Sequence, residues 1–121
     1  MRYEAPIWNA VKALPAKGYN WEALIAALKA RYEAECAARR RVNLWTEYEA
    51  EIASGMRGKR TAVTALMVGF VAGAATRIHH QPLSEESVIW GETYGTTNVW
   101  TDKEAEEAGN AEMLALIKTF H

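Results

Sequence analysis

The sequence predicts an all-α fold: a compact bundle of four to five helices around a buried central helix at about residues 61–78. Three observations lead to this prediction. Apolar residues recur at helical spacing through most of the chain. Residues 62–75 are apolar on almost every side, which is typical of a buried helix. Capping residues, glycines and prolines separate the helical stretches from one another.

Size and composition indicate a single domain over residues 1–121. The chain is 50% hydrophobic, which is enough apolar material for a core without a disulfide or a metal. Its 14 basic and 15 acidic side chains give a net charge of −1, which argues against a general nucleic-acid binder and against an acidic DNA mimic. The single cysteine, Cys36, excludes an internal disulfide and a multi-cysteine zinc site. We therefore expect a soluble, cytoplasmic protein.

The first half of the chain predicts two helical stretches. The first runs from Pro6 to Leu14, with proline at its first position, where its missing N–H costs nothing. The second begins after Asn20, which can cap the free N–H groups of the first turn, and its helical pattern continues to Gly55.

Within the second stretch the apolar stripe shifts by about a third of a turn near Arg39–Arg41, and Val42 and Trp45 belong to the later stripe. Either the helix breaks here, or one long helix presents different faces to two neighbours.

The central helix has one bulky face and one smooth face. The bulky face consists of Val63, Leu66, Met67 and Phe70, and the smooth face of Ala62, Ala65, Gly69, Ala72 and Gly73. We expect the smooth face to let another backbone approach closely, so that Gly69→Leu is as destabilising as truncation of Leu66 or Phe70 to alanine. The apolar run is shorter than the ~20 residues that a membrane-spanning helix needs.

The last third of the chain predicts an insert and a final helix. Near residues 87–100 strand-prone residues surround Gly91 and Gly95, which predicts a short irregular segment or a β-hairpin. Thr101 and Glu104 have the spacing of a capping box at the start of the last helix. Gly109-Asn110 indicates a kink within it.

One basic patch is a candidate binding site for phosphate, nucleic acid or an acidic protein surface. It comprises Arg39, Arg40, Arg41, Arg57, Lys59 and Arg60. The alternative interpretation is a solvated helix face, because acids such as Glu33 and Glu35 lie at helical spacing from the arginines.

No pattern in the sequence predicts catalysis, a cofactor or a metal. His79 and His80 are adjacent, so their side chains diverge, whereas helical metal ligands lie three or four residues apart. Gly55 and Gly58 predict a connection between helices, because no strand flanks them as a phosphate-binding loop requires. We interpret Glu86, Glu92 and Asp102 as caps and solvated acids. The protein is therefore predicted not to be an enzyme.

The aromatic content points to binding. Five tryptophans occur in the chain, and Trp90 and Trp100, with Tyr94 between them, fall outside the confident helices. Tryptophan, tyrosine and arginine dominate protein interfaces. We predict a non-enzymatic protein-interaction or assembly module, accessory, regulatory or inhibitory, of the kind phages and mobile elements encode. Trp90, Tyr94 and Trp100 are its candidate contact residues, toward a protein partner or a second copy. The alternative is a nucleic-acid-binding accessory protein that uses the basic patch.

Overall fold

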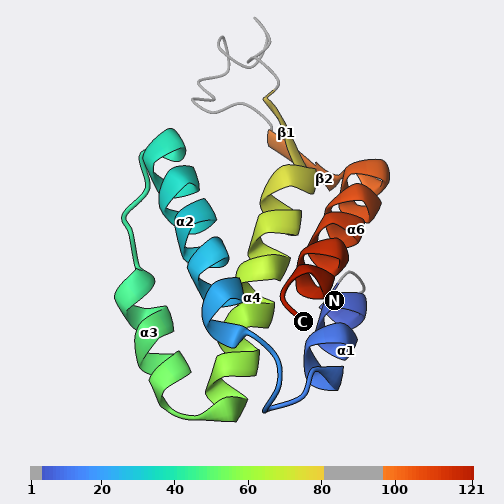
Figure 1. Cartoon of the computed structure of the whole chain (residues 1–121). Coiled ribbons are helices and arrows are strands. Elements are labelled where there is room, and N and C mark those ends of the chain that lie inside the picture. The colour runs from blue at the N-terminus through green and yellow to red at the C-terminus, as the bar shows by residue number, and fades with distance from the viewer. Residues whose placement is uncertain (1–3, 81–96) are drawn as a thin grey trace, which may run out of the picture.

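The computed structural model describes residues 4–80 and 97–121 and shows an all-α bundle, as predicted. Five helices and one pair of short strands occur among these residues. In chain order they are α1 (Glu4–Ala13), α2 (Trp21–Arg39), α3 (Trp45–Ala53), α4 (Met56–Ala75), β1 (Thr76–His80), β2 (Thr97–Thr101) and α6 (Lys103–Thr119). Helix α4 lies in the middle, with α2 and α3 on one side and α1 and α6 on the other (Figure 1).

Helix α4 is the centre of the core, as its apolar composition predicts. It packs against each of the other four described helices, and its buried residues include Val63, Leu66, Met67 and Phe70. No helix among the described residues is both long enough and apolar enough to cross a membrane.

The second predicted stretch divides into two helices at Arg40. Asn20 caps α2 as expected, because its Oδ1 accepts a hydrogen bond from the backbone N–H of Ala23 at 3.1 Å. At the other end Arg40 adopts the left-handed conformation with φ 52°, and the chain then runs without helix to Leu44. Val42 is consequently 78% exposed, so its predicted place on a buried stripe was wrong.

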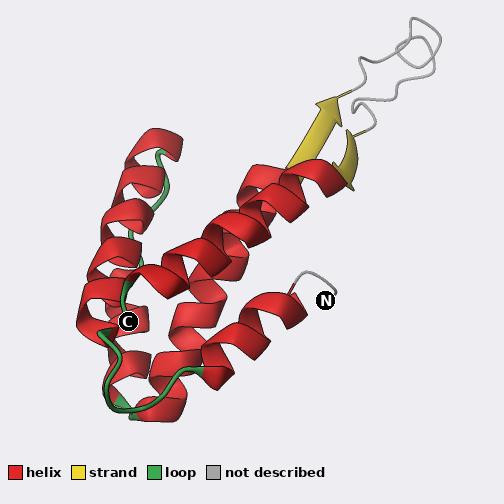
Figure 2. Cartoon of the chain, turned by 45° about the vertical axis from the view of Figure 1, so that its right-hand side comes forward, coloured by secondary structure: helices red, strands yellow, loops and turns green. Residues whose placement is uncertain are grey.

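The end of α4 and the insert also differ from the prediction. The helix ends at Ala75 rather than Ile78, and Thr76–His80 forms a strand instead. This strand pairs antiparallel with Thr97–Thr101, so that Thr76 faces Thr101 and His80 faces Thr97 (Figure 2). A hairpin contained within residues 87–100 is therefore not supported, and residues 87–96 lie outside the described part of the chain.

Helix α6 begins one residue later than a capping box at Thr101 requires. Asp102 is its N-cap, and the carboxylate accepts a hydrogen bond from Ala105 N at 3.2 Å. The helix continues through Gly109, where we predicted a kink. A Cβ at Gly109 would lie 3.2 Å from both methyl groups of Val71, so this glycine allows α6 to approach α4 closely.

The smooth face of α4 does not pack against a backbone along its whole length. Ala62 is fully buried, but Ala65 and Gly69 are exposed. A Cβ added at Gly69 would meet nothing within 4 Å. The premise of the Gly69→Leu prediction, a neighbouring backbone packed against Gly69, is therefore wrong for the described residues.

Tyr19 ties the connection between α1 and α2 to the end of the chain. Its side chain is only 6% exposed, and the hydroxyl donates a hydrogen bond of 2.5 Å to the carbonyl of Ile117. Its ring lies edge-on to Trp21 and His121, with centroid distances of 5.2 and 5.5 Å. Next to it, Asn20 N donates to Phe120 O at 3.0 Å.

Burial raises the pKa of Tyr19, which predicts a loss of stability in alkali. The folded protein holds the phenolic proton more tightly than the unfolded chain, whose tyrosine has the ordinary value of 10.0. This stabilisation is complete below that pH and is lost as the pH rises through the folded-state pKa.

We expect Tyr19→Phe to lower the free energy of unfolding by about 1 kcal/mol at neutral pH. In urea titrations the variant should also lose less stability than the wild type above pH ~10. If the wild type and Tyr19→Phe lose the same amount of stability above pH ~10, the raised pKa of Tyr19 is not the cause of the loss.

Candidate functional site

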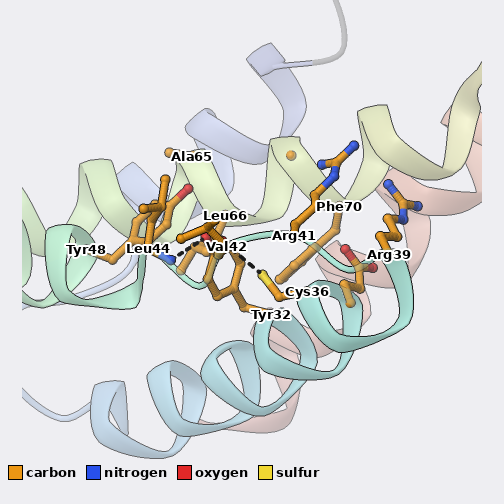
Figure 3. Close-up of a pocket in the computed structure, with 12 residues that line it drawn as sticks. Tyr32, Cys36, Arg39, Arg41, Val42, Leu44, Tyr48, Ala65, Leu66 and Phe70 are labelled. Atoms are coloured by element: carbon orange, nitrogen blue, oxygen red, sulfur yellow. Dashed lines mark hydrogen bonds between the residues drawn. The ribbon is translucent and has the colours of Figure 1, made fainter.

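A pocket of about 420 Å³ lies between α2, α3, α4 and the α2–α3 connection (Figure 3). Leu66 and Phe70 of α4, together with Cys36 of α2, form an apolar part of the lining, the floor of the pocket. Both α4 side chains are almost fully buried, at 2% and 4% exposure. The pocket therefore opens directly onto the hydrophobic core.

Aromatic side chains form one wall of the pocket and fix its shape. The rings of Tyr32 and Tyr48 meet edge to face, with centroids 5.4 Å apart, and Trp45 packs against both. The Tyr32 hydroxyl accepts a hydrogen bond from Leu44 N at 3.2 Å, and the Cys36 thiol lies 3.9 Å from Val42 O. These contacts hold the α2–α3 connection beside the pocket.

The phenol of Tyr48 stays uncharged at neutral pH. Burial raises its pKa, and the neighbouring Tyr32 and Glu47 raise it further. A protonated phenol can donate as well as accept a hydrogen bond. The wall therefore offers a neutral polar group beside apolar surface.

Two apolar side chains at the edge of the pocket are unusually accessible. Val42 is 78% exposed and Leu44 is 45% exposed, and they are the only exposed large hydrophobic residues among those described. Both line the pocket. Contiguous exposed apolar surface marks binding sites in folded proteins.

Charged residues occupy the other side of the pocket, where Arg39, Arg41 and Glu35 line it. The Glu35 carboxylate is 3.6 Å from Arg31 Nε, and Arg31 also contacts Glu112 and lies 5.0 Å over the Phe70 ring. Neither Arg39 nor Arg41 forms a salt bridge with a carboxylate of residues 6–76 or 101–121. Both arginines are exposed, so their positive charge faces solvent on this side of the pocket.

Gly73 provides the space for the Arg39 side chain. A Cβ at Gly73 would lie 3.0 Å from Arg39 Nη1 and 3.5 Å from Nη2, so the guanidinium lies directly against the glycine backbone. The predicted smooth face of α4 therefore serves partly to accommodate an arginine of α2.

The structure does not bring the predicted basic patch together. Arg39–Arg41 lie at the end of α2, whereas Arg57, Lys59 and Arg60 lie in the first turns of α4. Because Arg39 contacts Gly73, and a helix rises 1.5 Å per residue, about 20–24 Å of α4 separates the two groups. They form two separate basic regions.

Arg60 has a structural role of its own. Its Nη1 donates hydrogen bonds to the carbonyls of Val11 and Lys12 at 2.7 and 3.1 Å, at the end of α1. Its guanidinium lies 5.3 Å from the centroid of the Trp21 ring. Arg60 thus joins α1, α2 and α4 and is not available as a free phosphate ligand.

The predicted aromatic contact residues remain untested. Trp90 and Tyr94 lie outside the described residues, and Trp100 is described only by its backbone, which pairs with Arg77 in the strands. Sequence reasoning did not identify the pocket. The signal that would have located it is the position of Val42 and Leu44 just after three arginines, in a segment that is apolar but not helical.

Nothing among the described residues indicates a metal centre, because no group of three or more His, Cys, Asp or Glu side chains is placed to hold an ion there. No protein-family model, curated protein or solved structure shows a significant match to this chain.

Proposed function

We propose that this protein is a small, non-enzymatic protein-interaction module whose docking surface is the pocket between α2, α3 and α4. The observation that supports this proposal is the position of Val42 and Leu44, exposed at the edge of an apolar pocket. Interfaces are built from such surfaces, in which an anchoring side chain of the partner enters a preformed pocket. An accessory or assembly role in the cytoplasm, of the kind phages and mobile elements use, suits a scaffold of this size.

A leucine at position 69 provides a specific test of this proposal. Gly69 lines the pocket, and a Cβ added there meets no atom of the described residues within 4 Å. We expect Gly69→Leu to fill the pocket while leaving the melting temperature unchanged or slightly higher, because leucine also favours helix more than glycine does. In quantitative affinity capture from cell extract, a partner bound by the wild type should be retained at least about tenfold less by Gly69→Leu, as expected when a hot-spot pocket is blocked.

The matched control is Ala111→Leu, which adds an exposed leucine on α6, outside the pocket. This variant should capture the partner as well as the wild type. A partner captured equally by Gly69→Leu and the wild type would contradict docking at the pocket.

The predicted aromatic residues define a second set of variants for the same capture assay. If Trp90→Ala, Tyr94→Ala or Trp100→Ala abolishes capture while Gly69→Leu does not, the docking surface lies around residues 90–100 instead. Each variant must keep the wild-type melting temperature, because truncation of a core tryptophan costs about 3–5 kcal/mol of stability.

Nucleic-acid binding is the second candidate function, and the exposure of Arg39, Arg40 and Arg41 at one turn favours it. Phosphate contacts would make the affinity fall steeply with salt concentration. Submicromolar binding of DNA or RNA at physiological salt, lost when the three arginines are replaced by alanine, would favour this function over protein interaction.

A further inference from the structure

We propose that the pocket recognises a large apolar side chain adjacent to a carboxylate, presented by a segment of the partner protein. This inference rests on the proposed function, because it assumes that the partner docks at the pocket. It adds the chemistry of the partner: the apolar group occupies the floor, and the carboxylate binds Arg39 and Arg41.

The dimensions and the lining of the pocket suit an apolar anchor. Its volume of about 420 Å³ lies within the range of roughly 300–1,000 Å³ typical of ligand pockets. Leu66 and Phe70 form an apolar floor, and Val42 and Leu44 extend apolar surface to the edge. A side chain such as leucine or phenylalanine would bury apolar surface against these residues here.

The positive charges of the pocket favour a partner segment that carries a carboxylate next to its apolar side chain. Arg39 and Arg41 have no salt-bridge partner among the described residues, whereas the one acid of the lining, Glu35, lies beside Arg31. Guanidinium groups bind carboxylates with two parallel hydrogen bonds, and such charge-assisted bonds are stronger than neutral ones. A basic partner segment would meet two like charges.

An inorganic anion bound to Arg39 and Arg41 would make no contact with the apolar lining of the pocket. The Leu66 and Phe70 side chains that line the pocket offer no hydrogen bond to a hydrated phosphate ion. The same surfaces stabilise an apolar body attached to the anion. The combination of an apolar floor and two arginines that have no salt-bridge partner among the described residues therefore points to an apolar acid.

The ligand chemistry can be tested with 3-phenylpropionate and its neutral analogue 3-phenylpropanamide as probes. Binding to the full chain is followed by NMR chemical shifts, with the backbone amides of Leu44 and Gly69 as reporters at the pocket. We expect the carboxylate to bind about tenfold more tightly than the amide, corresponding to about 1.4 kcal/mol for a charge-assisted contact. Inorganic phosphate at the same concentration should leave both reporters unmoved.

Two double variants separate a specific contact from net charge. Arg39→Gln/Arg41→Gln should reduce carboxylate affinity about tenfold and remove the preference over the amide. Lys17→Gln/Arg57→Gln removes the same charge from exposed positions outside the pocket and should leave the affinity unchanged. Gly69→Leu should abolish binding of both probes.

Equal binding of carboxylate and amide, or wild-type affinity in the Arg39→Gln/Arg41→Gln variant, would overturn the inference while leaving docking at the pocket intact. The source of the ligand is tested by competition, because 3-phenylpropionate should displace the captured partner. If the probe binds through the arginines but displaces no partner, the pocket takes a free carboxylate and the assignment to a partner segment is wrong. If Gly69→Leu keeps its partner, it is the proposed function that fails.

Discussion

Replacement of Phe70 by alanine is expected to lower the free energy of unfolding by about 3–5 kcal/mol. The ring is only 4% exposed and belongs to the central cluster of α4, and the Arg31 guanidinium covers it at 5.0 Å. Truncation removes these contacts and leaves a cavity that merges with the pocket beside it. Urea denaturation followed by circular dichroism measures the loss.

Two further variants test whether the lost side-chain volume causes the destabilisation in Phe70→Ala. Phe70→Leu keeps most of the apolar volume and should cost less than about 1.5 kcal/mol. Leu66→Ala, at an equally buried position one turn earlier, should cost about 2–5 kcal/mol. A melting temperature unchanged in both alanine variants would mean that α4 is not the centre of the core.

Replacement of Gly58 by alanine is expected to destabilise the protein by about 2–3 kcal/mol, a large effect for one methyl group. A Cβ at this position would lie 2.1 Å from both the backbone oxygen of Glu51 and the hydroxyl of Ser54. The serine can rotate away, but the backbone oxygen belongs to α3 and cannot move without shifting that helix from α4. The measurement is again the free energy of unfolding in urea.

Gly69 provides the matched control, because it lies in the same helix and receives the same methyl group. Its added Cβ has no neighbour within 4 Å, so Gly69→Ala should stabilise the protein by about 0.5–1 kcal/mol through the reduced entropy of the unfolded chain. Opposite signs at positions 58 and 69 are the expected result. Stabilisation at both positions would show that α3 and α4 are farther apart than described.

The fold was predictable because apolar residues that recur at helical spacing lie on one face of a helix, and that face is buried. Leu24 and Leu28 fall on one face of their helix and are fully buried, and Asn20 caps that helix as its side chain predicts. The break was harder to place, because arginine suits a helix interior and its end equally well. Its location at Arg40 depends on non-local contacts, such as the bond between Leu44 N and the Tyr32 hydroxyl.

The candidate site was not predictable for the same physical reason. Val42 appears on a buried stripe if the helix continues, and becomes exposed only because the helix ends at Arg39. Gly69 resembles a packing glycine in the sequence, yet a Cβ added there would meet nothing within 4 Å in the described part of the chain. Whether a small residue faces a backbone or a pocket depends on where the next helix lies, and local propensity carries no information about that.

The strand pair has a consequence for how this chain can change over evolutionary time. His80 and Thr97 are opposite partners at the end of the ladder, so the connection between them starts and ends at points one strand spacing apart, about 5 Å. Residues inserted or deleted between these points leave the ends where they are, and each doubling of the length costs only about 0.6 kcal/mol of closure entropy. The pairing therefore fixes the separation of these two ends, whatever the length of the stretch that joins them. A change in the length of this stretch therefore need not disturb the pairing of Thr76–His80 with Thr97–Thr101.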